Sequence, residues 1–454
     1  MPFDSIDESC IQNQHKIKFL MHWFYRNAAL IFQLTQKDDE IKHPTLTAVP
    51  PVSVHLYDSA QKHVMSVPPD LHQQYLQTCQ NLSQPENHFV AHVLQEADKG
   101  DNSRQTKGIT LKIAGNNRLV PVQRVTDEDV QVLASVLCSA VFVTGLDLRY
   151  NNLTDVGVRH IATFLQSNET LLHLRMTGNK IGNKGGMYFA SMLQVNCTLE
   201  KLDLGDCDVG TQCLIAIASV LTQNRAVKAI NLNRPLLYSQ EEETTVRIAL
   251  MLKNNSSLVE LHLCKHEIKS LGVERLCEAL YENCSLRYLD LSCNKITRDD
   301  VKFLGELLKQ NQTLEILDLN SNRIEDDGAI YLSEALALYN RTLKALSVVS
   351  NKISGKGLVA LSQAMKINVE LSYIYIWGNN FDEAACMAFS ELIQADRLKP
   401  NCTDVEPYEV DGHVHLAELS HGLKKHYYWT PSYGEVKNAA ANASLAITAV
   451  SEYF

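Results

Sequence analysis

The sequence predicts an α/β fold, a curved solenoid in which short strands alternate with helices in repeats of 28 residues. One apolar frame recurs nine times along the chain at almost constant spacing. A helical apolar face follows the frame, and glycine and asparagine return at fixed places around that helix. A single globular core stops growing well below 454 residues, but a core that extends in one dimension through repeats has no such limit.

The frame is clearest in LRYLDLSCNKI, residues 286–296, which reads apolar-x-x-apolar-x-apolar-x-x-Asn-x-apolar. Leu289 and Leu291 suit a short strand that enters the core, and Asn294 stands where the chain turns inward. Its amide is expected to pair with turn groups that water cannot reach. The frame places in the same position Asn151, Asn179, Cys207, Pro235, His266, Asn294, Asn322, Asn351 and Asn379, at intervals of 28, 28, 28, 31, 28, 28, 29 and 28 residues. This is the leucine-rich repeat signature.

The second half of each repeat is predicted to be helical. In residues 155–171, Val158, Ile161, Ala162 and Leu165 follow the i, i+3, i+4, i+7 pattern of one helix face. One slot before the helix is shared by Gly157, Gly185, Gly272, Gly328 and Gly357. The helix ends at an asparagine in most repeats, in a position suited to a left-handed cap; these are Asn168, Asn196, Asn224, Asn255, Asn283, Asn311, Asn340 and Asn368.

The 28-residue frame resembles the ribonuclease-inhibitor-like leucine-rich repeats over roughly residues 108–395. The stretches LNRPLLYSQEEETTVRIALML, LKALSVVSNKISGKGLVALSQ and LKKHYYWTPSYGE are not generic repeat sequence, and they resemble one particular family within this class. The resemblance implies a strongly curved solenoid and a non-enzymatic interaction protein, without established catalytic residues to transfer to this chain.

One repeat is irregular. Pro235 takes the asparagine position, and three residues are gained within LLYSQEE before the helix resumes at Ile248. We interpret Glu241–Glu243 as favourable negative charge at the start of that helix. The alternative is a bulged loop that marks the edge of a partner's binding surface.

The chain is divided into four parts by changes in pattern. We expect an N-terminal extension or arm at residues 1–75, a helical region with a degenerate capping repeat at 76–140, the solenoid at 141–395, and a C-terminal hairpin and docking tail at 396–454. A helix is predicted near residues 86–97. Asp411-Gly412 between alternating runs predicts a two-residue β-hairpin, which could shield the last repeat.

Composition excludes several classes of protein. A net charge of −10 and a pI near 5.9 argue against a nucleic-acid or membrane-surface binder. The first residues are acidic rather than basic, so no secretory signal is predicted, and the apolar run at 16–34 is too polar to span a bilayer. No P-loop, HExxH, nucleophile or dinucleotide motif occurs, and no enzyme activity is expected.

Two groups of side chains could suggest a metal. His262, Cys264 and His266 have ligand types that zinc accepts, but no fourth ligand is visible, and we interpret them as variable surface positions of a repeat. The tail histidines His413, His415, His421 and His426 fit strand alternation at least as well. The twelve cysteines lack a CxxC pair and are expected to be reduced thiols. Neither a metal nor a cofactor is predicted.

A protein-binding surface is expected on the concave side, where positions beside the strand leucines face outward. The central column is predicted to contain Asp147, His173, Asp203, Asn231, His262, Asp290, Asp318, Ser347 and Tyr375. The neighbouring column is predicted to contain Arg149, Arg175, Gly205, Asn233, Cys264, Ser292, Asn320, Val349 and Trp377. Tyr373, Tyr375 and Trp377 give the last repeat an aromatic patch, which either binds a partner or is covered by Tyr427, Tyr428 and Trp429 of the tail.

We therefore expect a scaffold or recognition module that binds protein partners within a larger complex. The alternative is a regulator of a Ran-type GTPase, because a Ran GTPase-activating protein has similar 28-residue repeats; the absence of a long acidic tail argues against it. The oligomeric state stays open. We expect an intracellular protein of the cytoplasm, nucleus or nucleolus, or of a ciliary axoneme, and germ or ciliated cells are the place to test this.

Overall fold

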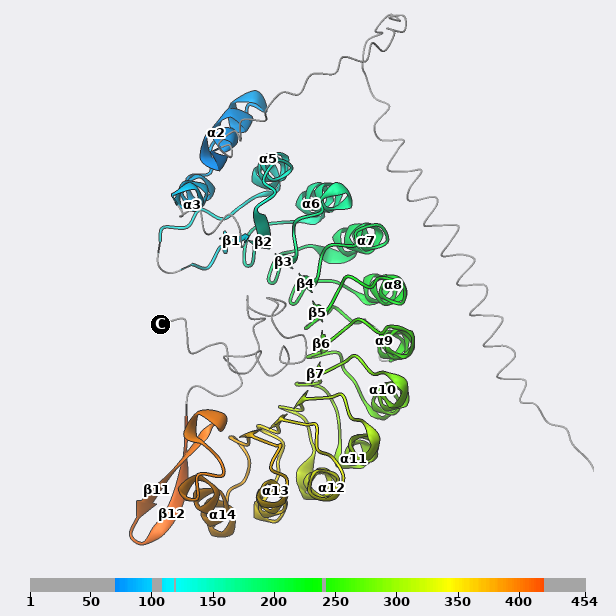
Figure 1. Ribbon diagram of the computed structural model, residues 1–454, viewed down its shortest axis with the longest axis vertical. Coiled ribbons are helices and arrows are strands. Elements are labelled where there is room, and N and C mark those ends of the chain that lie inside the picture. The colour runs from blue at the N-terminus through cyan, green and yellow to red at the C-terminus, as the bar shows by residue number, and fades with distance from the viewer. Residues whose placement is uncertain (1–69, 100–107, 118–119, 239–241, 420–454) are drawn as a thin grey trace, which may run out of the picture. The chain divides into compact units, whose positions relative to one another are not determined.

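The computed structural model describes residues 70–99, 108–117, 120–238 and 242–419. Within them, ten parallel strands form one sheet whose order follows the sequence (Figure 1). The strands are β1 Ile109–Lys112, β2 Val143–Asp147, β3 His173–Arg175, β4 Lys201–Asp203, β5 Ala229–Asn231, β6 Glu260–His262, β7 Tyr288–Asp290, β8 Ile316–Asp318, β9 Ala345–Ser347 and β10 Tyr373–Tyr375. The predicted α/β solenoid is confirmed.

One helix follows each strand and lies on the outer side of the curve (Figure 1). The helices are α5 Asp127–Leu137, α6 Asp155–Ser167, α7 Gly182–Leu193, α8 Thr211–Leu221, α9 Glu243–Asn254, α10 Ser270–Glu282, α11 Arg298–Gln310, α12 Glu325–Leu338, α13 Gly355–Ile367 and α14 Glu383–Gln394. The frame leucines, such as Leu289 and Leu291, are fully buried between strands and helices. The core therefore runs along the solenoid as a continuous layer.

The N-terminal part adds two helices and a first strand–helix unit to the solenoid. Helices α2 (Leu71–Asn81) and α3 (His88–Asp98) precede the sheet, and α3 lies where a helix was predicted. β1 pairs in parallel with β2, and α5 follows it, so the degenerate stretch forms the first strand–helix unit. The Tyr75 hydroxyl accepts a hydrogen bond from the Asn87 N–H at 3.1 Å, which ties the two helices together.

The turn asparagines bridge neighbouring repeats as predicted. Asn294 Nδ2 donates to the Leu291 carbonyl at 2.9 Å in its own repeat and to the Leu263 carbonyl at 3.0 Å in the preceding one. Its Oδ1 accepts from the N–H groups of His266 and Ile268. His266 replaces the asparagine in its own repeat, and its Nε2 lies 2.9 Å from the Leu232 carbonyl. Each amide thus satisfies buried backbone groups of two repeats.

Replacing Asn294 by alanine should lower the free energy of unfolding by about 1–3 kcal/mol, because buried carbonyls and N–H groups lose their partners. Chemical denaturation of the full chain measures this. Lys302 is an exposed residue of α11, so Lys302→Ala is the control and should leave the free energy of unfolding unchanged. Equal stabilities of the two variants would contradict the bridging role.

The asparagines at the helix ends differ from expectation. Asn168 and Asn283 have φ values of −81° and −76° and extended backbone, so the predicted left-handed cap is wrong. Their side chains, rather than their backbone conformation, connect the repeats through hydrogen bonds. Asn283 Nδ2 donates to the Leu252 and Asn255 carbonyls of the preceding repeat, while its Oδ1 accepts from Ser285 and Leu286. A second bridging ladder therefore runs along the helix side of the solenoid.

The irregular repeat has one unexpected contact. Glu242 Oε1 accepts from the N–H groups of Lys269 at 2.6 Å and Gly272 at 3.1 Å, so this carboxylate caps α10 of the next repeat rather than acting only on α9. Asp326 does the same for α13 through Ser354. Residues 239–241, which include Glu241, lie outside the described residues.

The predicted C-terminal hairpin is present. β11 (Val405–Val410) and β12 (His413–Glu418) pair antiparallel, and Asp411 and Gly412 both have positive φ, as a tight two-residue turn requires. The hairpin packs on α14 and forms its own two-stranded sheet rather than extending the main one. The chain after β10 is bound by Asp404, which follows the 3-10 helix η1 (Pro400–Cys402). Its carboxylate accepts from the N–H groups of Ile376 at 2.8 Å and Trp377 at 3.0 Å.

Candidate functional site

The strand face is the side of the sheet that points away from the helices, and its columns are defined by the strand register. Arg175 pairs with Asp147 on one side and with Asp203 on the other, so it belongs to the central column. The predicted placement of His173 there is wrong by two residues, and Thr177 rather than Arg175 belongs to the neighbouring column. A shift of two keeps a side chain on the same face, so alternation alone could not reveal the error.

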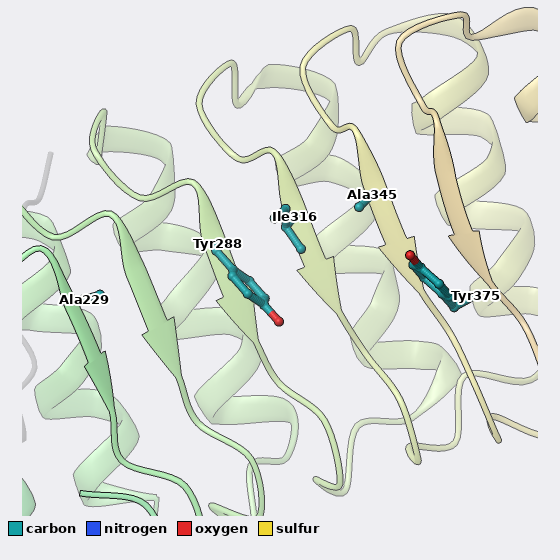
Figure 2. Close-up of a cluster of buried hydrophobic side chains, with 5 residues drawn as sticks. All are labelled: Ala229, Tyr288, Ile316, Ala345 and Tyr375. Atoms are coloured by element: carbon teal, nitrogen blue, oxygen red, sulfur yellow. The ribbon is translucent and has the colours of Figure 1, made fainter. Parts of the chain in front are cut away.

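An apolar cluster occupies this face over the second half of the solenoid. It consists of Ala229, Tyr288, Ile316, Ala345 and Tyr375, with Tyr373, Val259 and Val349 partly buried against it. Figure 2 shows Tyr288, Ile316 and Tyr375 projecting from their strands on the side away from the helices. Tyr288 is missing from the predicted surface, although its position two residues before Asp290 places it on the same face.

The three predicted aromatic residues of the last repeat differ in exposure. Tyr375 is only 1% exposed, so the expectation that it faces solvent is wrong. Tyr373 and Trp377 are partly exposed, and the Trp377 ring lies 5.9 Å from that of Phe381. Of the three predicted aromatic residues, only Tyr373 and Trp377 are therefore accessible.

An ionic cluster lies next to the apolar one. His262 Nε2 is 2.5 Å from Glu260 Oε1, and its Nδ1 is 3.3 Å from Asp290 Oδ2. The His262 ring contacts Tyr288 edge-on, with centroids 4.9 Å apart. Burial alone lowers the pKa of His262, but the charges and hydrogen bonds of the two carboxylates raise it to about 10. His262 is therefore a buried imidazolium at neutral pH.

The acidic residues and the histidine predicted for the second half of this face are buried. Asp290 and Asp318 are 0% exposed and His262 is 1% exposed, so the interpretation of Asp290 as a surface residue is wrong. His262 and His266 also serve different sides of the sheet, because His262 pairs with carboxylates on the strand face and His266 with the Leu232 carbonyl. Burial lowers the pKa of His266 to about 4, which keeps it neutral. They are structural residues rather than variable surface positions.

The first half of the strand face carries a second ionic network. Arg149 Nη2 lies 2.7 Å from Asp147 Oδ2, and Arg175 Nη1 lies 3.7 Å from the same oxygen. Burial and the neighbouring Arg149 lower the pKa of Arg175. Basic side chains thus accompany the acidic ones at this end, whereas carboxylates predominate around Asp290.

The C-terminal histidines are placed only in part. His413 Nδ1 is 3.0 Å from Glu383 Oε1 of α14, and the His415 ring lies 5.5 Å from that of Tyr408. Both contacts hold the hairpin, while His421 and His426 lie outside the described residues. No group of three or more metal-ligating side chains occurs in the part of the chain that the structure describes. No helix there is long and apolar enough to cross a bilayer.

Comparison with known sequences gives consistent results. A profile described as "Leucine Rich repeat" matches six segments, which are residues 142–162, 167–190, 195–218, 282–305, 310–333 and 339–362. The gap between 218 and 282 contains the irregular repeat and the His266 repeat. The chain is 56% identical over 410 residues to human leucine-rich repeat-containing protein 34, covering 84% of this chain and 88% of that protein.

The mouse protein of the same name is 53% identical over 411 residues, covering 84% of this chain and 99% of that protein. Among solved structures, leiomodin-1 actin-binding site 2 aligns with 29% of this chain and 76% of its own, at 22% identity and a TM-score of 0.25. That likeness is too remote to inform on function.

Proposed function

Because the chain belongs to the family of leucine-rich repeat-containing protein 34, whose repeats form the sheet described above, we propose that it is a non-enzymatic scaffold that binds protein partners through its strand face and terminal extensions. One observation supports this most: the partly exposed aromatic side chains of Tyr373 and Trp377 lie on the strand face, and Tyr373 packs against the buried cluster that contains Tyr288. Aromatic side chains are enriched at the centres of protein interfaces. Tyr373 and Trp377 are the proposed contact residues, whereas Tyr375, Asp290, Asp318 and His262 belong to the buried part of the same face.

The proposed division of labour follows the same boundaries. Residues 141–395 present the surface, 76–140 cap its first repeat, and 1–75 and 396–454 supply additional contacts. We place the protein inside the cell, in the cytoplasm, nucleus or nucleolus, or in a ciliary axoneme. Proximity labelling with the tagged full chain in germ cells and ciliated cells distinguishes these compartments.

Replacing Tyr373 and Trp377 together by alanine should reduce partner recovery about tenfold or more, because partly exposed aromatic residues dominate binding where interfaces have hot spots. The measurement is quantitative mass spectrometry of proteins captured with the full chain. The melting temperature should stay near that of the wild type.

The matched control replaces Phe303 and Tyr331, which are aromatic, 37% exposed and on adjacent helices of the outer face. This control should retain its partners. Loss of partners in the control but not in Tyr373→Ala/Trp377→Ala would move the binding surface to the helices.

The GTPase alternative is tested separately. A Ran-type GTPase regulator should accelerate GTP hydrolysis when the full chain is added at substoichiometric amounts, and a scaffold should not. An unchanged rate together with partner recovery favours the scaffold.

A further inference from the structure

Two partly exposed cysteines lie next to each other where the chain leaves β6 and β7. These strands pair in parallel, and their register places Cys264 opposite Ser292 and beside Cys293. The register continues past the ends of the strands, because the Lys265 N–H donates to the Ser292 carbonyl at 3.2 Å. The side chains of Cys264 and Cys293 are hydrogen-bonded to each other.

The backbone of this turn suits a bond between the two sulfur atoms. Cys293 has a φ of 55°, and the equivalent residues of the neighbouring repeats, Lys265 and Ser321, have φ values of 61° and 55°. The left-handed turn is therefore a property of the repeat. Diagonal neighbours on adjacent parallel strands have Cα atoms about 6 Å apart, within the range of roughly 4.4–6.8 Å that disulfides require. No other pair of these diagonal positions in the described repeats contains two cysteines.

The two thiols differ in acidity. The hydrogen bond from Cys264, together with Ser321 and the charge of Lys265, lowers the pKa of Cys293 to about 6, although burial opposes this change. The same hydrogen bond and burial raise the pKa of Cys264. Cys293 is therefore a thiolate at neutral pH, and Cys264 is a thiol that donates to it. The thiolate is the nucleophilic form of cysteine.

Other cysteines of the solenoid lack this combination of access, a thiolate and an adjacent thiol. Cys213 is 0% exposed, and burial raises its pKa to about 12, so it stays protonated and out of contact with solvent. Cys284 is exposed, but its thiol donates to the Glu282 carbonyl rather than to a second sulfur. These two positions provide a contrast to the pair on the strand face.

We propose that Cys264 and Cys293 form an oxidation site that closes to a disulfide in the presence of hydrogen peroxide. The Cys293 sulfur attacks one peroxide oxygen, so that an S–O bond forms, the O–O bond breaks and hydroxide leaves. This step oxidises the sulfur by two electrons to a sulfenic acid and reduces the peroxide. The hydroxide recovers the proton that the Cys293 thiol had released and becomes water.

The second step joins the two residues. The Cys264 sulfur attacks the Cys293 sulfur, an S–S bond forms as the S–O bond breaks, and the departing hydroxide takes the Cys264 proton as water. The sum converts two thiols and one hydrogen peroxide into one disulfide and two waters. A thiol reductant reverses the change by thiol–disulfide exchange.

The disulfide would connect the repeats of β6 and β7 and remove the negative charge of the thiolate from the strand face. Exposed Lys265 would then lose its anionic neighbour. Oxidation would therefore alter the surface offered to any partner that contacts this part of the face. That consequence rests on the proposed function, whereas the disulfide itself is measured without a partner.

Mass spectrometry of the reduced full chain after exposure to hydrogen peroxide tests the site. Trypsin places the two cysteines in separate peptides, residues 254–265 and 288–295. Free thiols are blocked with N-ethylmaleimide, and the chain is digested without a reductant. We expect the two peptides to be joined in most chains and to separate after dithiothreitol. A mixture of unlabelled and nitrogen-15-labelled chains should give no mixed pairs, because the bond forms within one chain.

Two serine variants assign the roles of the thiols. In Cys264→Ser, Cys293 should accumulate as a sulfenic acid that dimedone traps, because no adjacent thiol remains to displace the hydroxide. In Cys293→Ser, dimedone labelling of Cys264 should be about tenfold weaker or less, since Cys264 is protonated. Cys284→Ser is the matched control, and its yield of joined peptides should equal that of the wild type.

Three outcomes would overturn the proposal. Peptides that stay separate in the oxidised wild type would show that the two thiols do not form a bond. Mixed pairs of labelled and unlabelled peptides would assign the disulfide to two chains. Equal dimedone labelling of the two serine variants would show that Cys293 is not the attacking thiol. A thermal melt verifies that each variant is folded, and none of these measurements involves a partner, so they do not depend on the scaffold assignment.

Discussion

Replacing His262 by alanine is expected to lower the free energy of unfolding by about 3–5 kcal/mol, the largest single-residue effect predicted for this protein. The imidazolium lies within 3.3 Å of Asp290 and 2.5 Å of Glu260, and all three side chains are at most 3% exposed. Without the cation, the buried carboxylates of Glu260 and Asp290 lose the positive charge that contacts both of them. Urea denaturation of the full chain measures the difference.

His173 provides the matched control. It lies on the same face, two residues before Arg175, and burial together with nearby Lys201 and Arg175 lowers its pKa to about 3. A neutral histidine leaves no buried charge behind, so His173→Ala should cost about 1 kcal/mol or less. Similar losses for the two histidine variants would show that charge pairing is not what stabilises His262.

The His262 effect should also depend on pH. Its folded-state pKa of about 10 lies above its ordinary value of 6.5, so its contribution is complete below pH 6.5 and is lost as the pH rises through about 10. The stability difference between the wild type and His262→Ala should therefore shrink between pH 7 and pH 10.5. A difference that stays constant over this range would mean that the imidazole is not protonated in the folded chain.

Replacing Asp404 by alanine is expected to lower the free energy of unfolding by about 2–4 kcal/mol, because it exposes the end of the sheet. The N–H groups of Ile376 and Trp377 would lose their acceptor within a buried setting. In the preceding repeat, the Val348 N–H, which corresponds to that of Ile376, donates to the Tyr375 carbonyl. The Val349 N–H, which corresponds to that of Trp377, donates to Asn320 Oδ1. A thermal melt and a soluble-aggregate measurement report the change.

Glu406→Ala is the control for Asp404. Glu406 is an exposed acidic residue of β11 and carries the same formal charge. Its replacement should change stability by no more than about 0.5 kcal/mol. A stable Asp404→Ala chain would show that the β11–β12 hairpin on α14, rather than the carboxylate, protects the last repeat.

The repeating part of this fold could be predicted because the same spacing of apolar residues and asparagine recurs in each repeat. Leu289, Leu291 and Asn294 have a fixed spacing that only a strand and an inward turn satisfy, and both were found. The Asp411-Gly412 turn could be predicted equally well, because positive φ at two consecutive residues favours such a pair. Local pattern was sufficient in both cases.

The burial of the candidate site could not be predicted, because alternation identifies a face but not what lies over it. Asp290 and Tyr375 have the sequence positions of exposed strand residues, and yet both are buried. The protonation state of His262 could not be predicted either, because it depends on Glu260 of its own strand and on Asp290 of the next repeat. The contact of Glu242 with α10 likewise joins residues of different repeats.

The central claim is that the strand face, rather than the helix face, contacts protein partners. Site-specific photo-cross-linking in cells tests it directly, with benzoylphenylalanine placed at Cys264 or Trp377 on the strand face and at Phe303 or Tyr331 on the helix face. We predict adducts with other proteins from the strand-face positions. Intermolecular adducts that arise only from Phe303 and Tyr331 would contradict the claim.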